Sequence, residues 1–291
     1  MTILFQVQAF TKDGAGGNAA GVVCDAGGLS VPEMLSIAAK AGFSETAFVC
    51  ESESADHRVR FFTPTREVNL CGHATIATYH LLLERKLVEP GSYSMETLAG
   101  EQRIEVSEDG LVAMTQNPPT FGEVLAPEAV APVLGLEAQD LMDSSKMPAQ
   151  IASTGLHKIF VPVKSLDVLQ RVVPDLDGID KLSRSVGAIG TYVFSLESVA
   201  GGTAHCRNFA PVVGIQEDSA TGTSAAALSC LLYQYGQVSA AQAGSGLVFE
   251  QGYAISQPSE IVVRLGLSND AISEVWVAGR AQTVSGEPGV K

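Results

Sequence analysis

The sequence has few basic residues and no long apolar run, and each shortage excludes a class of protein. Only 18 Lys and Arg oppose 32 Asp and Glu, giving a formal charge of −14, and the basic residues do not cluster. An electrostatic grip on nucleic acid or anionic lipid is therefore not expected. No apolar run reaches the roughly 18 residues of a membrane-spanning helix, and the N-terminal residues lack a signal-peptide pattern. We expect a cytoplasmic protein that contacts neither nucleic acid nor membrane.

Cysteine is also scarce, and its spacing excludes two kinds of framework. The five cysteines are Cys24, Cys50, Cys71, Cys206 and Cys230, and no two of them form a C-x-x-C pair. Their odd number and wide spacing predict neither a disulfide framework nor a zinc site, so no metal is expected. Cys206 and Cys230 stand in apolar runs and are predicted to lie in the core.

What the sequence does contain is an internal repeat. "RFFTP" at 60–64 recurs as "RNFAP" at 207–211, and each copy precedes a glycine that opens an alanine-rich apolar helix, Gly72 or Gly222. The arginines lie 147 residues apart and the glycines 150, so the second copy carries three extra residues. The repeat predicts two halves with one plan. The segment 117–132 is the expected seam, because its four prolines should interrupt any regular structure.

The order of the expected elements indicates the fold class. Strand-like runs follow one another in each half and do not alternate with helices, which favours an α+β fold over a doubly wound α/β fold. Each half should form a mostly antiparallel sheet or barrel around its central apolar helix. "GAGGNA" at 14–19 matches a loose dinucleotide fingerprint, but a strand-like run follows it where a helix would be needed. We therefore predict a glycine-rich hairpin turn there and no cofactor.

Both predicted helices begin at a glycine-containing turn. These turns are Cys71-Gly72-His73 and Thr221-Gly222-Thr223-Ser224. The first N–H groups of a helix lie at its positive end and have no partner within the helix, so such a turn can hold an anion. If the halves pack face to face, the two turns converge on one cleft that suits a small carboxylate. Two ordinary capped helices are the alternative, and the residues leave both open.

Six blocks, in order from about residue 5 to residue 253, resemble the PhzF family of phenazine-biosynthesis-like isomerases, which have the diaminopimelate epimerase fold. The blocks are "FTKDGAGGNAAGVV", "FSETAFV", "RFFTPTREVNLCGHATIA", "STGLHKIFVPV", "RNFAPVVGIQEDSATGTSAAAL" and "FEQG". The resemblance implies two pseudo-symmetric domains, a site in the cleft between them, no cofactor and a possible homodimer. We place the domains at 1–118 and 128–291, with the last strand able to return to the first.

Family chemistry is transferred residue by residue. The resemblance implies that Glu45 moves a proton and that His73 and Asp218 hold and polarise the substrate. A carboxyl group desolvated in a closed cleft can both give and take a proton near neutral pH. The implied substrate-binding residues are Ser44, Gly72, Gly222 and either Thr223 or Ser224. His157 and Lys158 also lie in a family block, but a pair at a strand end is expected at the surface.

A rival reaction is epimerisation, which needs two opposed thiols. Cys71 stands where the first thiol would be, but the equivalent residue of the second half is Thr221, whose hydroxyl is far too weakly acidic. Cys71 is therefore predicted to be an inert small residue. We expect a proton-moving isomerase acting on a small carboxylate, dihydro-hydroxyanthranilate-like or amino-acid-like. An epimerase using Cys71 and a non-catalytic ligand-binding protein remain alternatives.

The sequence also departs from the family pattern. "EDSATGTSA" lacks the proline that commonly follows the aspartate and the usual "GSA", and "SQPS" at 256–259 lacks the arginine that commonly precedes the proline. Contacts to the substrate are therefore expected to differ.

Overall fold

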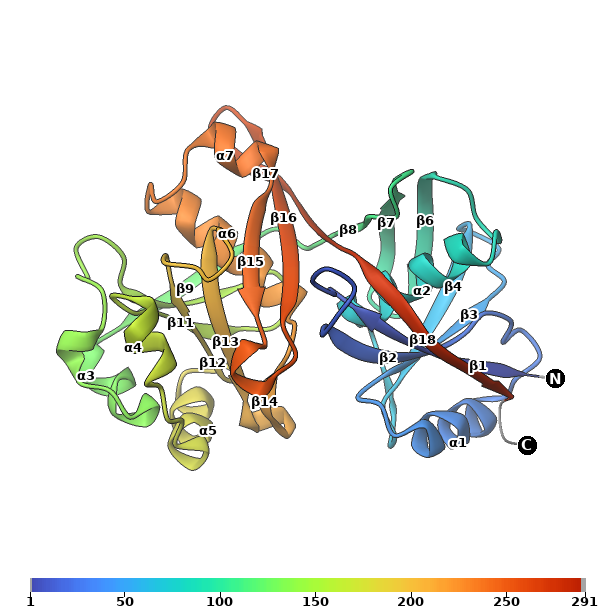
Figure 1. Ribbon diagram of the computed structural model, residues 1–291, viewed down its shortest axis with the longest axis horizontal. Helices are drawn as coiled ribbons and strands as arrows, with labels where there is room; N and C mark the ends of the chain where they lie inside the picture. Colours follow the sequence, from blue (N-terminus) through green and yellow to red (C-terminus); the bar gives the residue numbers. More distant parts are fainter. Residues whose placement is uncertain (1, 289–291) are drawn as a thin grey trace. The chain divides into compact units, whose positions relative to one another are not determined.

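Two apolar helices begin at the repeated glycines, as predicted: α2 (Gly72–Glu84) and α6 (Gly222–Gln234). The computed structural model describes residues 2–288 (Figure 1). The described chain divides into two units by internal contacts. The first comprises the chain up to Thr115 together with the chain from Ala278 onward, and the second is Gln116–Val277. The predicted domains, 1–118 and 128–291, are meant as independently folding pieces of the chain. A division by internal contacts does not test independent folding, so these boundaries stay a prediction.

The first unit is mostly antiparallel sheet. Only its β2–β3 and β4–β6 pairs are parallel among the described residues, and β18 pairs antiparallel along the whole of β1. Its strands are β1 (Ile3–Ala9), β2 (Asn18–Val23), β3 (Thr46–Cys50), β4 (His57–Phe62), β5 (Glu67–Val68), β6 (Gly91–Thr97), β7 (Gly100–Val106), β8 (Val112–Thr115) and β18 (Ala281–Pro288). Its helices are α1 (Val31–Ala41) and α2.

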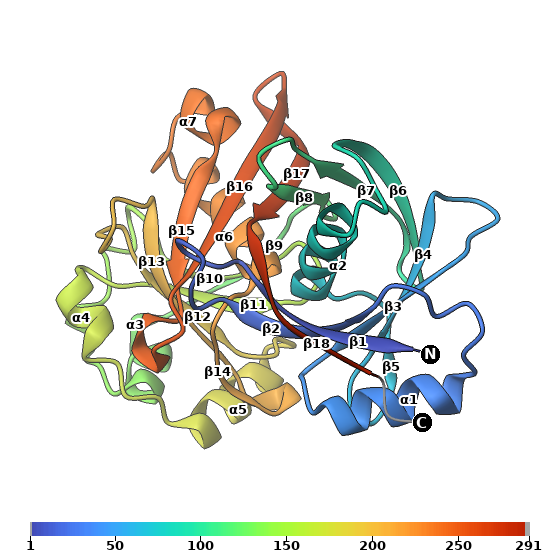
Figure 2. The same ribbon diagram turned by 45° about the vertical axis from the view of Figure 1, so that its right-hand side comes forward.

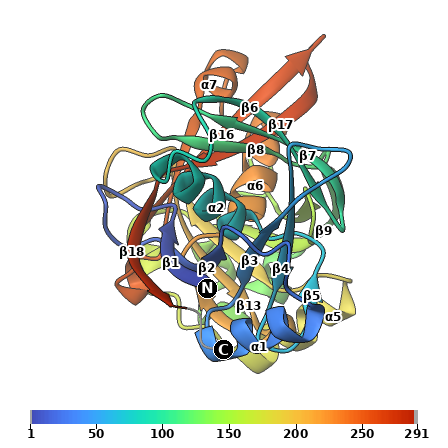
Figure 3. The same ribbon diagram turned by 90° about the vertical axis from the view of Figure 1, so that its right-hand side faces the viewer.

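Helix α2 is the centre of the first unit. It packs against β1, β2, β3, β7, β8 and β18, and Figure 3 shows these strands around it. Its buried residues run continuously from Ala74 to Tyr79 and include Leu81 and Leu82. A helix that is apolar on all sides is stable only when it is enclosed. The composition of this helix therefore requires the surrounding sheet.

The second unit repeats this plan with more helices. Its strands are β9 (Thr120–Leu125), β10 (Ala149–Ser153), β11 (Lys158–Pro162), β12 (Thr191–Ser195), β13 (Ala204–Ala210), β14 (Ile215–Asp218), β15 (Leu247–Gln251), β16 (Ser259–Ser268) and most of β17 (Ala271–Gly279). Its helices are α3 (Pro127–Val130), α4 (Leu166–Gln170), α5 (Leu176–Ser185), α6 and α7 (Ala240–Ser245). Ten of the thirteen residues of α6 are buried, and the helix packs against β10, β16 and α7 (Figure 2).

Strand pairing shows that the two units are copies. In the first unit β2 pairs parallel with β3, and Gly21 N donates to Glu45 O at 3.1 Å. In the second unit β11 pairs parallel with β12, and Ile159 N donates to Gly190 O at 3.0 Å. The three extra residues of the second copy fall in the loop that holds the short 3₁₀ helix Pro211–Val213. The predicted α+β fold with two pseudo-symmetric halves is confirmed.

The expectation that the prolines of segment 117–132 interrupt regular structure was wrong, whereas the segment's place as the seam between the domains stays a prediction. The segment contains β9, which pairs with β10, and the short helix α3. The prolines do not interrupt the strand because they flank it: Pro118 and Pro119 precede β9, and Pro127 begins α3.

The glycine-rich segment after β1 is a turn between two strands, as predicted. Gly14, Gly16 and Gly17 have φ of 77°, 65° and 82°, a left-handed region that glycine adopts without strain. β2 follows directly, so no helix N-terminus is present there to hold a pyrophosphate. Within residues 2–288 no helix has the length and apolar character needed to cross a membrane.

Candidate active site

The N-terminus of α2 is formed by two of the predicted site residues, Gly72 and His73, together with Cys71. Cys71 is the N-cap in an extended conformation, and Gly72 and His73 begin the helix. The first turn contains no acidic side chain, so nothing within it neutralises the positive end of the helix. A Cβ added to Gly72 would meet only Met114 Sδ, at 3.9 Å. The helix entrance therefore has space and positive potential for a small anion.

Glu45 lies beside this entrance. Its carboxylate Oε2 is 3.5 Å from His73 Nε2, and the side chains of His73 and Glu45 are 12% and 22% exposed. Ser44 Oγ lies 3.5 Å from the same ring nitrogen, and Cys71 Sγ lies 3.4 Å from His73 Nδ1. The structure thus brings three predicted site residues, Ser44, Glu45 and His73, from two separate blocks into one cluster with Cys71, which we call the Glu45 cluster. Its carboxylate, imidazole and thiol can each exchange a proton.

The same cluster could hold a metal ion. One donor atom each from Glu45, Cys71 and His73 lie within 4.8 Å of one another. Zinc takes sulfur, nitrogen and oxygen donors of this kind, and three protein ligands leave one position for water or substrate. The prediction that the site uses no metal stays untested.

The entrance to α6 is built from hydroxyl groups. Thr221 is the N-cap, and Thr154 Oγ1 donates to the carbonyl of Thr223 at 3.1 Å. Ser224 is 3% exposed, whereas Thr223 is partly exposed. Thr223 is therefore the more accessible of the two hydroxyls between which the sequence left the choice open.

Asp218 stands at the end of β14 and is fixed by its neighbours. Thr221 Oγ1 donates to Asp218 Oδ2 at 2.5 Å. Gln251 Nε2 donates to the Asp218 carbonyl at 2.8 Å and to Thr221 Oγ1 at 3.1 Å. Tyr192, fully buried, donates to Gln251 Oε1 at 3.0 Å. A carboxylate held by such a network keeps one orientation.

A family model described as phenazine biosynthesis-like protein, PhzC-PhzF, matches residues 7–286. The chain belongs to the PhzF family. An uncharacterized isomerase of Clostridium acetobutylicum is 36% identical over 290 residues, covering 97% of this chain and 95% of the relative. The crystal structure of a PhzF-family protein from Bacillus anthracis superposes with a TM-score of 0.89 at 34% identity and covers 98% of both chains. A trans-2,3-dihydro-3-hydroxyanthranilate isomerase of Pseudomonas chlororaphis is 28% identical over 283 residues, covering 95% of each chain.

These relatives confirm the family and the enzyme class. PhzF proteins are isomerases, so this chain is an enzyme of an isomerase family. More distant solved epimerases share the fold, which confirms the diaminopimelate epimerase-like architecture.

The expectation for Lys158 was wrong, although the one for its neighbour was right. His157 is exposed, but Lys158 begins β11, is 3% exposed and donates a hydrogen bond to Asn208 Oδ1. Burial lowers the pKa of Lys158 to about 8, and the nearby Asp218 carboxylate opposes this lowering. One difference within the repeat could have indicated a polar partner for Lys158: Asn208 is polar, whereas Phe61, its counterpart in the repeat, is apolar.

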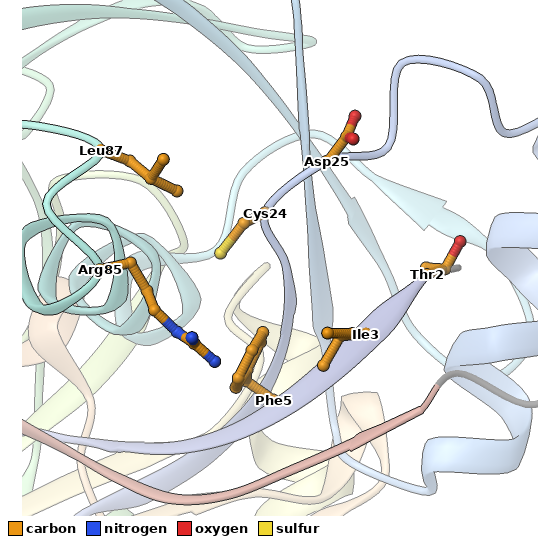
Figure 4. A pocket seen from close by; sticks show the side chains of 7 residues that line it. All are labelled: Thr2, Ile3, Phe5, Cys24, Asp25, Arg85 and Leu87. Carbon is orange, nitrogen blue, oxygen red and sulfur yellow. The ribbon is translucent and has the colours of Figure 1, made fainter.

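A pocket of about 370 Å³ lies at the other end of α2 (Figure 4). Arg85 follows the last residue of the helix, and its guanidinium stacks 4.3 Å from the centre of the Phe5 ring. His73 and Arg85 are twelve positions apart in the chain, which corresponds to about 18 Å along a helix. Burial raises the pKa of Cys24 in this pocket to about 11, against the opposing effect of Arg85, so its thiol stays protonated. Its lining within residues 2–288 includes one carboxylate, Asp25, but no imidazole, so the pocket does not repeat the Glu45 cluster.

Proposed function

We propose that this PhzF protein is a cofactor-independent isomerase that moves a proton between atoms of a small carboxylate, with Glu45 as acid and base. The observation that carries the proposal is the 3.5 Å contact between Glu45 and His73 at the positive end of α2. Glu45 would take a proton from one substrate carbon, electrons would shift through the adjacent double bond, and Glu45 would return the proton to another carbon. His73 would polarise the substrate, and the N–H groups at the helix entrance would bind its carboxylate.

The second unit supports a mechanism with one base. The residue equivalent to Glu45 is Gly190, where an added Cβ would lie 1.9 Å from the Phe209 carbonyl oxygen. No side chain fits there without moving the backbone. The residue equivalent to Cys71 is Thr221, whose hydroxyl is not a usable base. At these two equivalent positions the second copy therefore has neither the carboxylate nor the thiol that a symmetric two-base epimerase would require.

A relative supports the proposed substrate class. The Pseudomonas chlororaphis relative acts on trans-2,3-dihydro-3-hydroxyanthranilate, a small cyclic amino acid. We propose a substrate of this kind or a related amino-acid-like carboxylate. The assignment of Asp218 and the α6 entrance to the same substrate stays a prediction from the resemblance, as does a homodimer.

The test is a Glu45→Gln variant assayed in deuterated water. We expect normal folding and a loss of turnover of at least about a thousandfold, because an amide cannot exchange the proton that a carboxyl group carries. The substrate would be the dihydro-hydroxyanthranilate, or a carboxylate chosen by screening a panel for thermal stabilisation. Turnover and solvent deuterium incorporation would be followed by NMR.

Glu51→Gln is the matched control, since Glu51 is an exposed acid in the same unit. Near-native turnover in Glu45→Gln would remove Glu45 from the mechanism. Binding without any deuterium exchange in the parent protein would favour the non-catalytic alternative.

A further inference from the structure

Lys158 is a buried ammonium group that the proposed mechanism does not use. It is 3% exposed and donates to the side-chain oxygen of Asn208, which is 1% exposed. A buried cation is costly unless hydrogen bonds and an opposite charge compensate it. A neutral amide supplies only the hydrogen bond, so the compensating charge must come from another group.

Asp218 is that group. Asn208 on β13 pairs directly with Asp218 on β14. The carboxylate also raises the pKa of Lys158 against the larger effect of burial, as a nearby anion must. Lys158, Asn208 and Asp218 therefore form a continuous polar row, which we call the Lys158 row, and it ends next to the N-cap of α6.

The fold itself does not require the Lys158 row. Because the strand pairings of the two units match, the equivalent positions in the first unit can be identified as Ala20, Phe61 and Val68. All three are apolar there, and Ala20 and Phe61 are completely buried. Apolar residues in place of a buried ion pair are often neutral or stabilising. The polar row in the second unit therefore needs an explanation other than stability.

The charge of the ligand that this protein would bind explains the presence of the Lys158 row. A carboxylate arriving beside Asp218 would place two negative charges together in a chain that already carries −14. Such a pair disfavours binding or forces one group to take up a proton. The buried ammonium of Lys158 cancels the charge of Asp218 from behind, so that the α6 entrance accepts an anion.

We propose that Lys158 is a specificity-determining residue that, held by Asn208, neutralises Asp218 and so allows the α6 entrance to bind a carboxylate in preference to a neutral ligand. This rests on the proposed function for the small-carboxylate class of the substrate, and on the family resemblance for placing that substrate at the α6 entrance. Lys158 acts through Asp218 and is a positioning residue, not a catalytic one.

The binding test compares anthranilate with its uncharged amide, anthranilamide, by calorimetry. Lys158→Met should weaken anthranilate binding at least about tenfold and leave anthranilamide binding within about twofold, because only the anion is repelled by the uncompensated Asp218. Lys181→Met is the control for a lost positive charge, since Lys181 is exposed on α5, and it should change neither affinity. Equal losses for both ligands, or no loss for anthranilate, would overturn the proposal.

If Lys158→Met fails to fold, the double variant Lys158→Met/Asn208→Leu takes its place. It makes the Lys158 and Asn208 positions apolar, as Ala20 and Phe61 are in the first unit, keeps Asp218, and leaves no unpaired amide. The same discrimination between the two ligands is expected, and its absence contradicts the proposal.

A second measurement needs no ligand. The ε-amino group of Lys158 would be titrated by NMR in the parent and in Asp218→Asn, where loss of the carboxylate should lower its pKa further. An unchanged pKa would show that Lys158 and Asp218 are not coupled and would overturn the proposal. Should the parent bind neither probe, the proposed substrate class fails, and this titration alone decides whether the charge pair exists.

Discussion

The two units contain the same bidentate arginine–glutamate pair between two neighbouring strands. In the first, Arg60 donates through Nε and Nη2 to Glu67, both at 2.7 Å; in the second, Arg207 donates in the same way to Glu217, at 2.9 and 2.8 Å. Each pair joins the strand of the repeated motif to the short strand that leads into the central helix. Bidentate pairs of this geometry fix strand register as well as adding energy. The repeat has therefore preserved what holds each helix entrance in place.

The units differ in the groups they place around that framework. The first has the Glu45 cluster at its helix entrance, whereas the second has hydroxyl groups there and Gly190 at the position of Glu45. Conversely, the second has the Lys158 row where the first is apolar. The Glu45 cluster thus lies in one copy, and the anion site that we propose lies in the other. The two copies therefore share the framework and differ in the chemical groups placed on it.

The largest expected contrast in stability involves a second base–carboxylate contact found at equivalent positions of the two copies. Arg58 and Glu96 pair at 3.4 Å in the first unit, with side chains 41% and 34% exposed. The equivalent pair, His205 and Glu250, lies at 2.8 Å and is 7% and 1% exposed. Glu250 also accepts backbone N–H groups from Val199, Ala200 and Gly202.

We therefore expect Glu250→Gln to cost about 3 kcal/mol of unfolding free energy, because it leaves buried donors poorly satisfied. Glu96→Gln should cost less than about 1 kcal/mol, as exposed pairs do. Urea denaturation of both variants measures the difference. Equal losses would mean that burial does not distinguish the two pairs.

The pH dependence of stability should follow Glu250 as well. Burial alone would raise the pKa of this carboxyl, but the hydrogen bonds from His205 and the three backbone N–H groups outweigh it and lower the pKa. A lowered folded-state pKa means that the stabilisation is present above the unfolded value of about 4.5 and is lost as the pH falls through the folded value. The unfolding free energy of the parent should thus decline below about pH 4.5. Glu250→Gln should show a shallower decline, and identical slopes would refute this assignment.

A smaller contrast is expected between the two arginines of the framework. Arg207 and Glu217 are each 12% exposed, and Arg207 also donates to the Val172 carbonyl at 2.8 Å, whereas Arg60 and Glu67 are 19% and 20% exposed. Arg207→Met should therefore lower the unfolding free energy by about 2 kcal/mol and Arg60→Met by about 1 kcal/mol. Denaturant midpoints at constant m-value would report both. A larger loss for Arg60→Met would reverse the comparison.

Much of the fold could be predicted because its signals are local or repeated. "RFFTP", "RNFAP" and the two glycine-led apolar helices are visible in the sequence, and the repeat carries the pseudo-symmetry. The Glu45 cluster was predictable only through the family resemblance, since Glu45 and His73 come from separate blocks. Lys158 was missed because its partners, Asn208 and Asp218, are 50 and 60 residues away in the sequence. Burial of a lysine depends on such distant contacts, which no local pattern contains.

The smallest expected effect on turnover concerns Cys71. Its size distinguishes a one-base isomerase from an epimerase that uses Cys71. The Cys71 thiol is 8% exposed and lies 3.4 Å from His73 Nδ1, an arrangement in which imidazole could activate a thiol. In a one-base isomerase Cys71 mainly packs at the helix entrance. Cys71→Ala should then cost about 1 to 2 kcal/mol of stability and leave turnover within about tenfold. In an epimerase the same change deletes a proton-transfer group, and turnover should fall by orders of magnitude.

Cys206→Ala is the matched control, because Cys206 is completely buried and burial raises its pKa to about 12. The measurements are turnover of both variants and the rate at which iodoacetamide inactivates the parent with and without substrate. Inactivation of the parent that substrate prevents, together with abolished turnover in Cys71→Ala alone, would make Cys71 the base. Retained turnover in that variant would leave Glu45 as the proton carrier, since Gly190 and Thr221 offer no second base in the other copy.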